Sequence, residues 1–211
     1  MMRIDLSKDL AKPLVKHLSS AKEMQPDLWW RAEVAQIGSH VCVVAEEQYS
    51  HYILVLCGLG KDDFANFPQL FLDRLWREVA VICKLSGLYD RETLAKHLLA
   101  ICGEQRYHLD PEPQEEGRLL SVMEKLERGF LYERQPLPTD GKSAFEFGFE
   151  INSRKPKTER EGDKPSAAEA LGNYCLNLIE EQLAAEQELI RASVPGPDNI
   201  VRVDFLRQRR L

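Results

Sequence analysis

The chain has 211 residues, of which 44% are hydrophobic and 29% charged, and its formal net charge is −6 at pH 7. This composition is ordinary for a globular protein, and the length allows a substantial buried core. No apolar run approaches the roughly 20 residues that cross a bilayer, so we expect no membrane partner. Net acidity also disfavours general affinity for nucleic acids, which depends on neutralising phosphates with basic side chains.

The N-terminus and the cysteines indicate a cytoplasmic protein. The first nine residues carry two aspartates, one lysine and one arginine where a secretory signal peptide has an apolar core. No CxxC pair occurs among the five cysteines, which are Cys42, Cys57, Cys83, Cys102 and Cys175. Their mostly apolar surroundings favour reduced, buried thiols.

The first third of the chain predicts strands around one helix. Apolar alternation predicts strands over residues 3–6 and 28–37, with a helix over residues 10–18 between them. An apolar hairpin follows, with strands over residues 41–45 and 52–57. Between them, the paired acids Glu46 and Glu47 favour a solvated turn.

Both faces of this hairpin are apolar. If residue 46 pairs with residue 51, alternation gives one face Cys42, Val44, Ile53 and Val55, and gives the other Val41, Val43, Leu54 and Leu56. Such a hairpin lies inside a sheet that is covered on both sides, or it packs against a second subunit.

The same register tests the hairpin as a metal site. It places His40 opposite Cys57, with Cys42 two residues along and His51 at the other end of the face. Zinc takes four such ligands in a tetrahedron, and at most three cluster here. We therefore expect no bound metal.

Helical periodicity dominates the middle of the chain. Apolar residues recur at helical spacing over residues 67–82, 90–103 and 118–130. A short strand is predicted between two of these helices, over residues 105–109.

The C-terminal third changes in character. Phe145, Phe147 and Phe149 alternate with glutamate and glycine, which predicts a strand with aromatic side chains on one face. A capping box at Ser166 begins a helix that runs to about residue 191. Residues 200–205 predict a last strand, and a basic tail follows.

Together these elements predict an α+β fold, with a small, mostly antiparallel sheet and a central apolar hairpin packed by several helices. We expect an α+β core domain over residues 1–134. Residues 135–165 form a strand and linker rich in proline, glycine and charge, and residues 166–211 form the C-terminal helix, the final strand and the basic tail.

The chain opens with Met2-Arg3-Ile4-Asp5-Leu6-Ser7-Lys8-Asp9-Leu10, and it later reads Trp30-Arg31-Ala32-Glu33 ahead of an apolar strand. These segments resemble an uncharacterised family of small bacterial proteins that are often linked to plasmids and prophages, and the opening is similar to the family's Met-Arg-Ile-x-Leu-Thr-Lys-Lys-Leu. Trp30-Arg31-Ala32-Glu33, ahead of Val41-Cys42-Val43-Val44, is similar to the family's Trp-aromatic-Ala-Asn ahead of an apolar strand, but Arg31 and Glu33 depart from it. The resemblance covers roughly residues 2–130. It implies an α+β fold and a mobile-element setting, and no chemistry.

No catalytic constellation is assembled in the sequence. A nucleophile needs a base within reach, and no Gly-x-Ser-x-Gly elbow occurs. Adjacent carboxylates on a strand point to opposite faces, so Glu46 and Glu47 cannot easily assist one another. We name no catalytic residue and no cofactor, and an enzyme is the less favoured class.

The candidate binding residues fall into two groups. Trp29, Trp30, Arg31 and Glu33 lie on the second predicted strand, and an exposed Trp beside Arg is typical of an interface hot spot. The alternative is that both indoles are buried; because the family resemblance centres on Trp30, it implies that Trp30 is buried and Trp29 the more exposed. The second group is the C-terminal arginine cluster: Arg202, Arg207, Arg209 and Arg210.

Three hypotheses of function remain. The favoured one is a non-catalytic protein-binding or regulatory protein of a bacterial mobile element, homodimeric, with an inhibitor of a host defence complex as one example. The second is a nucleic-acid-associated factor that uses Trp29, Trp30, Arg31 and the C-terminal arginines. The third is an enzyme whose site is not recognised.

Overall fold

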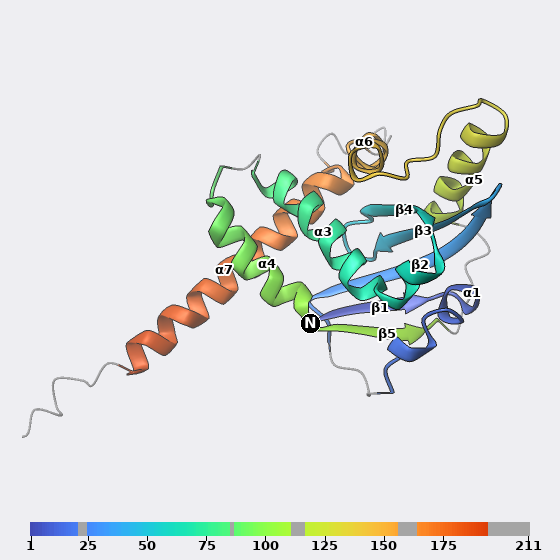
Figure 1. Cartoon of the computed structure of the whole chain (residues 1–211). Helices are drawn as coiled ribbons and strands as arrows, with labels where there is room; N and C mark the ends of the chain where they lie inside the picture. Colours follow the sequence, from blue (N-terminus) through green and yellow to red (C-terminus); the bar gives the residue numbers. More distant parts are fainter. Residues whose placement is uncertain (21–24, 85–86, 111–116, 156–163, 194–211) are drawn as a thin grey trace, which may run out of the picture. The chain divides into compact units, whose positions relative to one another are not determined.

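A five-stranded mixed sheet forms the centre of the protein (Figure 1). The strands are β1 (Met2–Leu6), β2 (Leu28–Ile37), β3 (His40–Glu47), β4 (Ile53–Leu59) and β5 (Gln105–Leu109), in the order β4-β3-β2-β1-β5. β1 pairs in parallel with β2 and β5, while β2, β3 and β4 pair antiparallel. The fold is therefore α+β with a mostly antiparallel sheet, as the sequence predicts.

This computed structural model describes residues 1–20, 25–84, 87–110, 117–155 and 164–193. Contacts divide the chain into two compact units, residues 1–179 and 180–211. The sheet and the features built on it belong to the first unit. The predicted final strand over residues 200–205 lies outside the described residues.

The segment after β1 is helical in two short pieces. α1 (Lys8–Ala11) is capped by Ser7, whose hydroxyl accepts the amide of Leu10, and a 3₁₀ turn follows over Val15–His17. The prediction of one helix over residues 10–18 is wrong. Pro13 explains the break, because it has no amide proton to donate and its ring clashes with the preceding turn.

The hairpin register differs by two residues from the predicted one. Glu46 pairs with Ile53, and Cys42 pairs with Cys57. A shift of two keeps every side chain on its predicted face, because the side-chain period of a strand is two. His40, however, pairs with Ile37 of β2 and not with Cys57. The hairpin forms one side of the sheet, and β4 is an edge strand.

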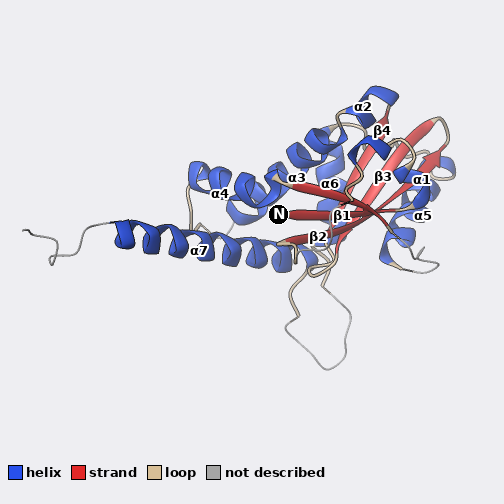
Figure 2. Cartoon of the chain, turned by 90° about the horizontal axis from the view of Figure 1, so that it is seen from below, coloured by secondary structure: helices blue, strands red, loops and turns tan. Residues whose placement is uncertain are grey.

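Helices of the same chain cover both faces of the hairpin. α3 (Phe67–Lys84), with α4 (Arg91–Gly103) beside it, lies on one side of the sheet. α5 (Arg118–Leu131) lies on the other side, where Leu119, Val122 and Leu126 pack against the hairpin (Figure 2). α6 (Gly141–Asn152) lies along the edge formed by β4. The sequence leaves open whether the hairpin is covered on both sides within its own chain or packs against a second subunit, and the structure shows the first arrangement.

α6 corrects the prediction of a strand over residues 145–149. Asp140 caps a helix here, and its carboxylate accepts the amides of Lys142 and Ser143. Ala144, Gly148 and Asn152 are buried at helical spacing. The aromatic alternation is also compatible with a helix, because Phe145 and Phe149 are four residues apart and their rings stack at 5.7 Å.

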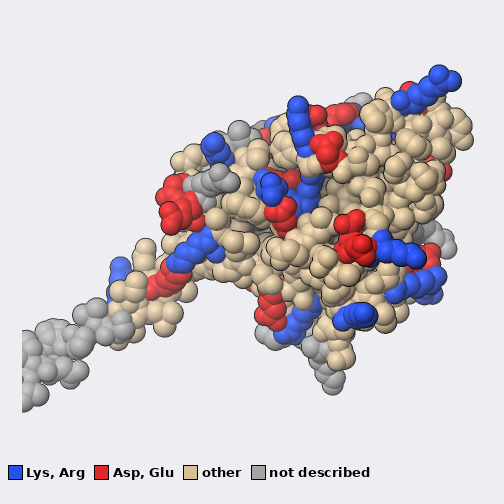
Figure 3. Space-filling view, in the orientation of Figure 1, with Lys and Arg blue, Asp and Glu red and all other residues tan. Residues whose placement is uncertain are grey.

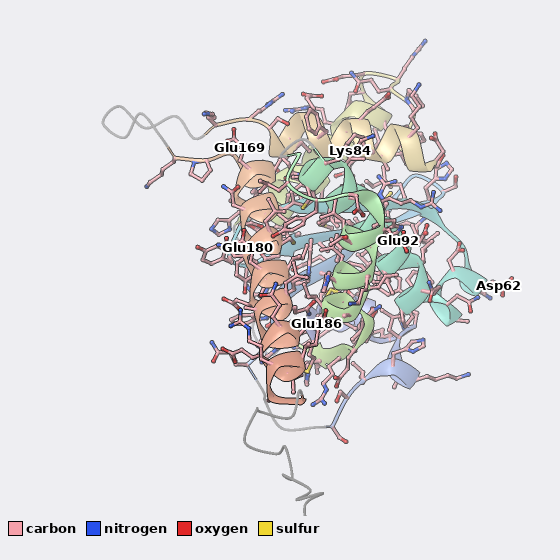
Figure 4. All side chains as sticks on the ribbon, turned by 90° about the vertical axis from the view of Figure 1, so that its left-hand side faces the viewer. Asp62, Lys84, Glu92, Glu169, Glu180 and Glu186 are labelled. Carbon is pink, nitrogen blue, oxygen red and sulfur yellow. The ribbon has the colours of Figure 1, made fainter. Side chains whose placement is uncertain are left out.

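The remaining helices follow the sequence closely. α2 (Lys61–Ala65) is a single turn before α3. α7 (Ala167–Ser193) begins with the predicted capping box, in which Ser166 and Glu169 exchange two hydrogen bonds of 2.7 and 3.3 Å. Figure 4 shows Glu169 in the first turn of α7 and Glu180 and Glu186 farther along the helix. All five cysteines are buried free thiols.

Candidate binding surface on the sheet

A partly open face of the sheet lies opposite α3. The parallel pairing of β1 with β2 places Arg3 beside Trp29 and Asp5 beside Arg31. Alternate residues point to opposite faces, so these four side chains share one face with Glu33. α5 and α6 cover this face only over β3, β4 and the end of β2. We call these five side chains the Trp29 surface.

Trp29 is held in place although 44% of it is exposed. Its Nε1 donates to Asp5 Oδ2 at 2.7 Å, and the Arg3 guanidinium lies 5.1 Å from the centre of its ring. Arg3 Nε also donates to Asp5 Oδ1 at 2.8 Å. Because two neighbours already fix the indole, the Trp29 side chain loses little conformational entropy when a partner binds to it.

Arg31 and Glu33 extend the Trp29 surface along β2. Arg31 Nε lies 2.5 Å from Oδ2 of the buried Asp110, which follows β5. Glu33 is half-buried, and burial raises the pKa of its carboxyl; the Arg31 charge opposes this shift and the Asp110 charge adds to it. The Trp29 surface thus carries both signs of charge around one exposed indole.

Trp30 belongs to the core, as expected. It is fully buried, and its ring meets Phe71 of α3 edge-on at 5.5 Å. Its Nε1 has no hydrogen-bond partner among the described residues. Trp30 is therefore closed to a partner in the folded protein, and of the two candidate indoles only Trp29 can make such a contact.

A second aromatic feature adjoins the start of β2. The amide of Gln48 donates to the carbonyl of Trp29 at 2.8 Å, which places Tyr49 at the end of the same ladder. Tyr49 is 71% exposed, and its ring lies 4.8 Å from that of Tyr174 on α7. The Tyr174 hydroxyl donates to the carbonyl of Asp27 at 2.7 Å. Sequence reasoning missed this pair, which only the fold brings together.

The hairpin carboxylates are structural. Glu47 is buried and accepts the amides of Tyr49 and Ser50 at 3.1 and 2.6 Å, so it organises the turn. Glu46 is also buried and lies 2.9 Å from His51 Nδ1. The expectation of a solvated turn is wrong for this pair, because β4 and the turn amides enclose both acids.

The thiols of Cys42 and Cys57 meet across the hairpin. A hydrogen bond from Cys57 lowers the pKa of Cys42 and raises that of Cys57. His40 lies elsewhere in the ladder, as described above. In the described parts of the chain, no group of three or more His, Cys, Asp or Glu side chains is arranged to hold a metal ion.

A buried charged group links α3 to the hairpin and α6. Arg74 Nε lies 2.6 Å from Glu78 Oε1, and the Tyr52 hydroxyl donates to Glu78 Oε2 at 2.7 Å. Burial raises the pKa of both Glu78 and Tyr52. Arg74 Nη1 also donates to the carbonyl of Gly141 at 2.6 Å. These contacts tie α3 to the hairpin and to the start of α6. The three side chains are buried, so a substrate could not reach them.

Sequence reasoning missed two members of the Trp29 surface, Arg3 and Asp5, and the neighbouring Asp110. The parallel pairing of β1 with β2 and β5 brings them together, and no local sequence pattern predicts such pairing. The second predicted group lies outside the described residues: Arg202, Arg207, Arg209 and Arg210. Within the described segments, no helix combines the length and apolarity that a membrane span requires.

Comparison with known families gives one match. Residues 3–147 match a domain of unknown function, DUF6933. A search of curated proteins finds no match to the chain. The matched residues run from β1 into α6, and they include the whole of the Trp29 surface. The chain therefore belongs to the DUF6933 family, in agreement with the resemblance of its N-terminal segments to a family of unknown function.

Proposed function

We propose that the protein is a non-catalytic protein-binding protein and that the Trp29 surface is where its partner binds. The observation that carries the proposal is a partly exposed indole fixed by Asp5 and Arg3 on the face of the sheet. Trp, Tyr and Arg dominate hot spots in protein interfaces, and Tyr49 and Tyr174 lie beside the same strand.

The charges support a protein partner over a nucleic acid. Arg3 is paired with Asp5 and Arg31 with Asp110, so both cations of the Trp29 surface already have a carboxylate. A phosphate backbone needs uncompensated basic side chains. Figure 3 shows the other side of the molecule, covered by α3 and α4, and there too acidic and basic side chains are interspersed rather than segregated.

The setting in a plasmid or prophage rests on the resemblance of residues 2–130, and the cytoplasmic location rests on the five free thiols. Within that setting we propose a regulatory role, with inhibition of a host defence complex as one example. We also propose a homodimer, for which the second unit supplies the apolar side chains discussed below.

The test compares three alanine variants in affinity capture from a bacterial lysate. Trp29→Ala should lose a protein that the wild type retains, because truncating a hot-spot residue costs about 2 kcal/mol or more, roughly 30-fold in Kd. Tyr132→Ala removes an aromatic residue that is 79% exposed on another element, and it should retain the same protein.

Thermal unfolding separates binding from folding in this test. Trp29→Ala should stay folded and lose only about 1–2 kcal/mol with its hydrogen bond to Asp5, whereas Trp30→Ala should lose about 3–5 kcal/mol because it empties a buried site. The proposal is wrong if Trp29→Ala and the wild type capture the same proteins with equal affinity. Capture that disappears after nuclease treatment would favour the nucleic-acid alternative.

A further inference from the structure

A basic pocket opens between α5 and α6. Its volume is about 450 Å³, within the range of small-ligand sites. Four of its lining residues are cationic: Arg118, Lys125 and Arg128 from α5, and Arg154, two residues after the end of α6. Ser121 adds a hydroxyl to the wall. No carboxylate is among the described residues that line it.

Arg118 is the cation most in need of a counterion. It is half-buried, and its Nη2 makes two long hydrogen bonds, to the carbonyl of Ile151 at 3.3 Å and to Asn152 Oδ1 at 3.4 Å. Both acceptors are neutral, and no ion pair joins Arg118 to a carboxylate among the described residues. Burial lowers the pKa of its guanidinium, and the charge of Glu46 opposes this shift. A cation held this way is stabilised by an added anion.

The other cations are only partly neutralised. Lys125 and Arg154 share one carboxylate, that of Glu150, with Lys125 Nζ at 3.1 Å from Oε1. Arg128 reaches Glu133 only at 3.7 Å. The pocket wall therefore holds more positive than negative charge, although the whole chain is acidic.

We propose that this pocket binds a compact, multiply charged anion of the phosphate class. Guanidinium groups present forked donors that match phosphate oxygens, and a lysine and a hydroxyl add single donors around them. The pocket could take free phosphates or the phosphate groups of a nucleotide, since the same chemistry recognises both. This activity is independent of protein binding at the Trp29 surface.

The experiment is calorimetric titration of the full chain with pyrophosphate at low ionic strength. We expect a saturable site with a Kd below about 1 mM. Arg154→Gln should weaken binding by roughly threefold to tenfold, because it removes a charged donor. Glu150→Gln should strengthen binding, because it frees Lys125 and Arg154 from a competing carboxylate.

A second ion pair supplies matched controls. Arg77 and Asp73 of α3 form an i,i+4 pair like Arg154 and Glu150, and Arg77 is 70% exposed against 68% for Arg154. Arg77→Gln and Asp73→Asn therefore change the net charge equally, but outside the pocket. Neither should alter pyrophosphate affinity.

Two results would overturn the proposal. One is that binding does not saturate at pyrophosphate concentrations up to about 5 mM, five times the expected upper limit of the Kd. The other is an equal effect from the α3 pair and the α5–α6 pair, which would mean general electrostatic attraction. A titration with ATP then identifies the source of the phosphate: tighter binding than pyrophosphate supports a nucleotide, and equal binding supports free phosphates.

Discussion

At the scale of single residues, neighbours in the sequence have opposite roles. Trp29 is 44% exposed, whereas Trp30 is fully buried against Phe71. The reason is the alternation of a strand, which sends adjacent side chains to opposite faces. The same alternation gives Arg31 and Glu33 to the face of Trp29, so that a charged surface and a core share one strand.

Glu33 should make stability depend on pH in a defined direction. Burial raises the pKa of its folded-state carboxyl above the unfolded value, so its ionised form is disfavoured in the fold. Its contribution to stability is fully present below the unfolded pKa and is lost as pH rises through the folded pKa. Glu33→Gln should therefore stabilise at pH 7, by about 0.5 kcal/mol or less, and have less effect near pH 4.

Urea unfolding at the two pH values measures this difference, and Glu124→Gln, an exposed glutamate of α5, is the control. A Glu33→Gln variant that is less stable than the wild type at pH 7 would show that the ionised carboxylate contributes favourably to the fold.

At the scale of elements, α6 seals the edge of the sheet. Asn152 at the end of α6 accepts the amide of Ile53 at 2.8 Å and donates to its carbonyl at 2.7 Å. The side-chain amide thus replaces the next strand at the start of β4. Gly148 faces the same carbonyl, and a Cβ there would lie at an ordinary contact distance of 3.6 Å from the Ile53 oxygen.

Asn152→Ala should lower the free energy of unfolding by about 1–3 kcal/mol, because it leaves a buried amide and a buried carbonyl unpaired. Asn177→Ala, at an exposed position of α7, should change it by less than about 0.5 kcal/mol. Chemical denaturation of both variants measures the difference. Equal stability of the two variants would mean that water replaces the amide of Asn152 at no cost.

At the scale of the whole molecule, the hairpin gives no reason for a dimer, because helices of the same chain cover both of its faces. The C-terminal part of α7 does. Leu189 and Ile190, in the second unit, are 71% and 62% exposed. Exposed apolar side chains that adjoin one another on a helix often mark a protein–protein interface, and here we expect one between two copies of the chain.

We therefore expect light scattering to give about twice the chain mass of 24.2 kDa. Replacing both Leu189 and Ile190 with glutamate should return the mass to that of one chain, because the charges would oppose each other across the interface. Leu88→Glu, which changes a leucine that is 62% exposed elsewhere, should leave the mass unchanged. A wild-type mass near 24.2 kDa would contradict the homodimer.

The sequence by itself determined the elements whose side chains repeat with one clear period. The bounds of β2 and β5 agree with the prediction to the residue, and α3, α4, α5 and α7 agree closely. Strand alternation also placed Trp29 and Trp30 on opposite faces, because it needs only local information, and the family resemblance, which centres on Trp30, indicated which of the two is buried.

Only the tertiary structure decided the rest. Residues 145–149 satisfy both a period of two and a helical pair, and the helix buries Ala144, Gly148 and Asn152 on one side, where Asn152 bonds to Ile53. The partners of Trp29 and Arg31 come from β1 and from Asp110 after β5, and the basic pocket joins residues 118–128 to Arg154. Such contacts between distant segments follow from parallel pairing and helix packing, which leave no periodic signal in the sequence.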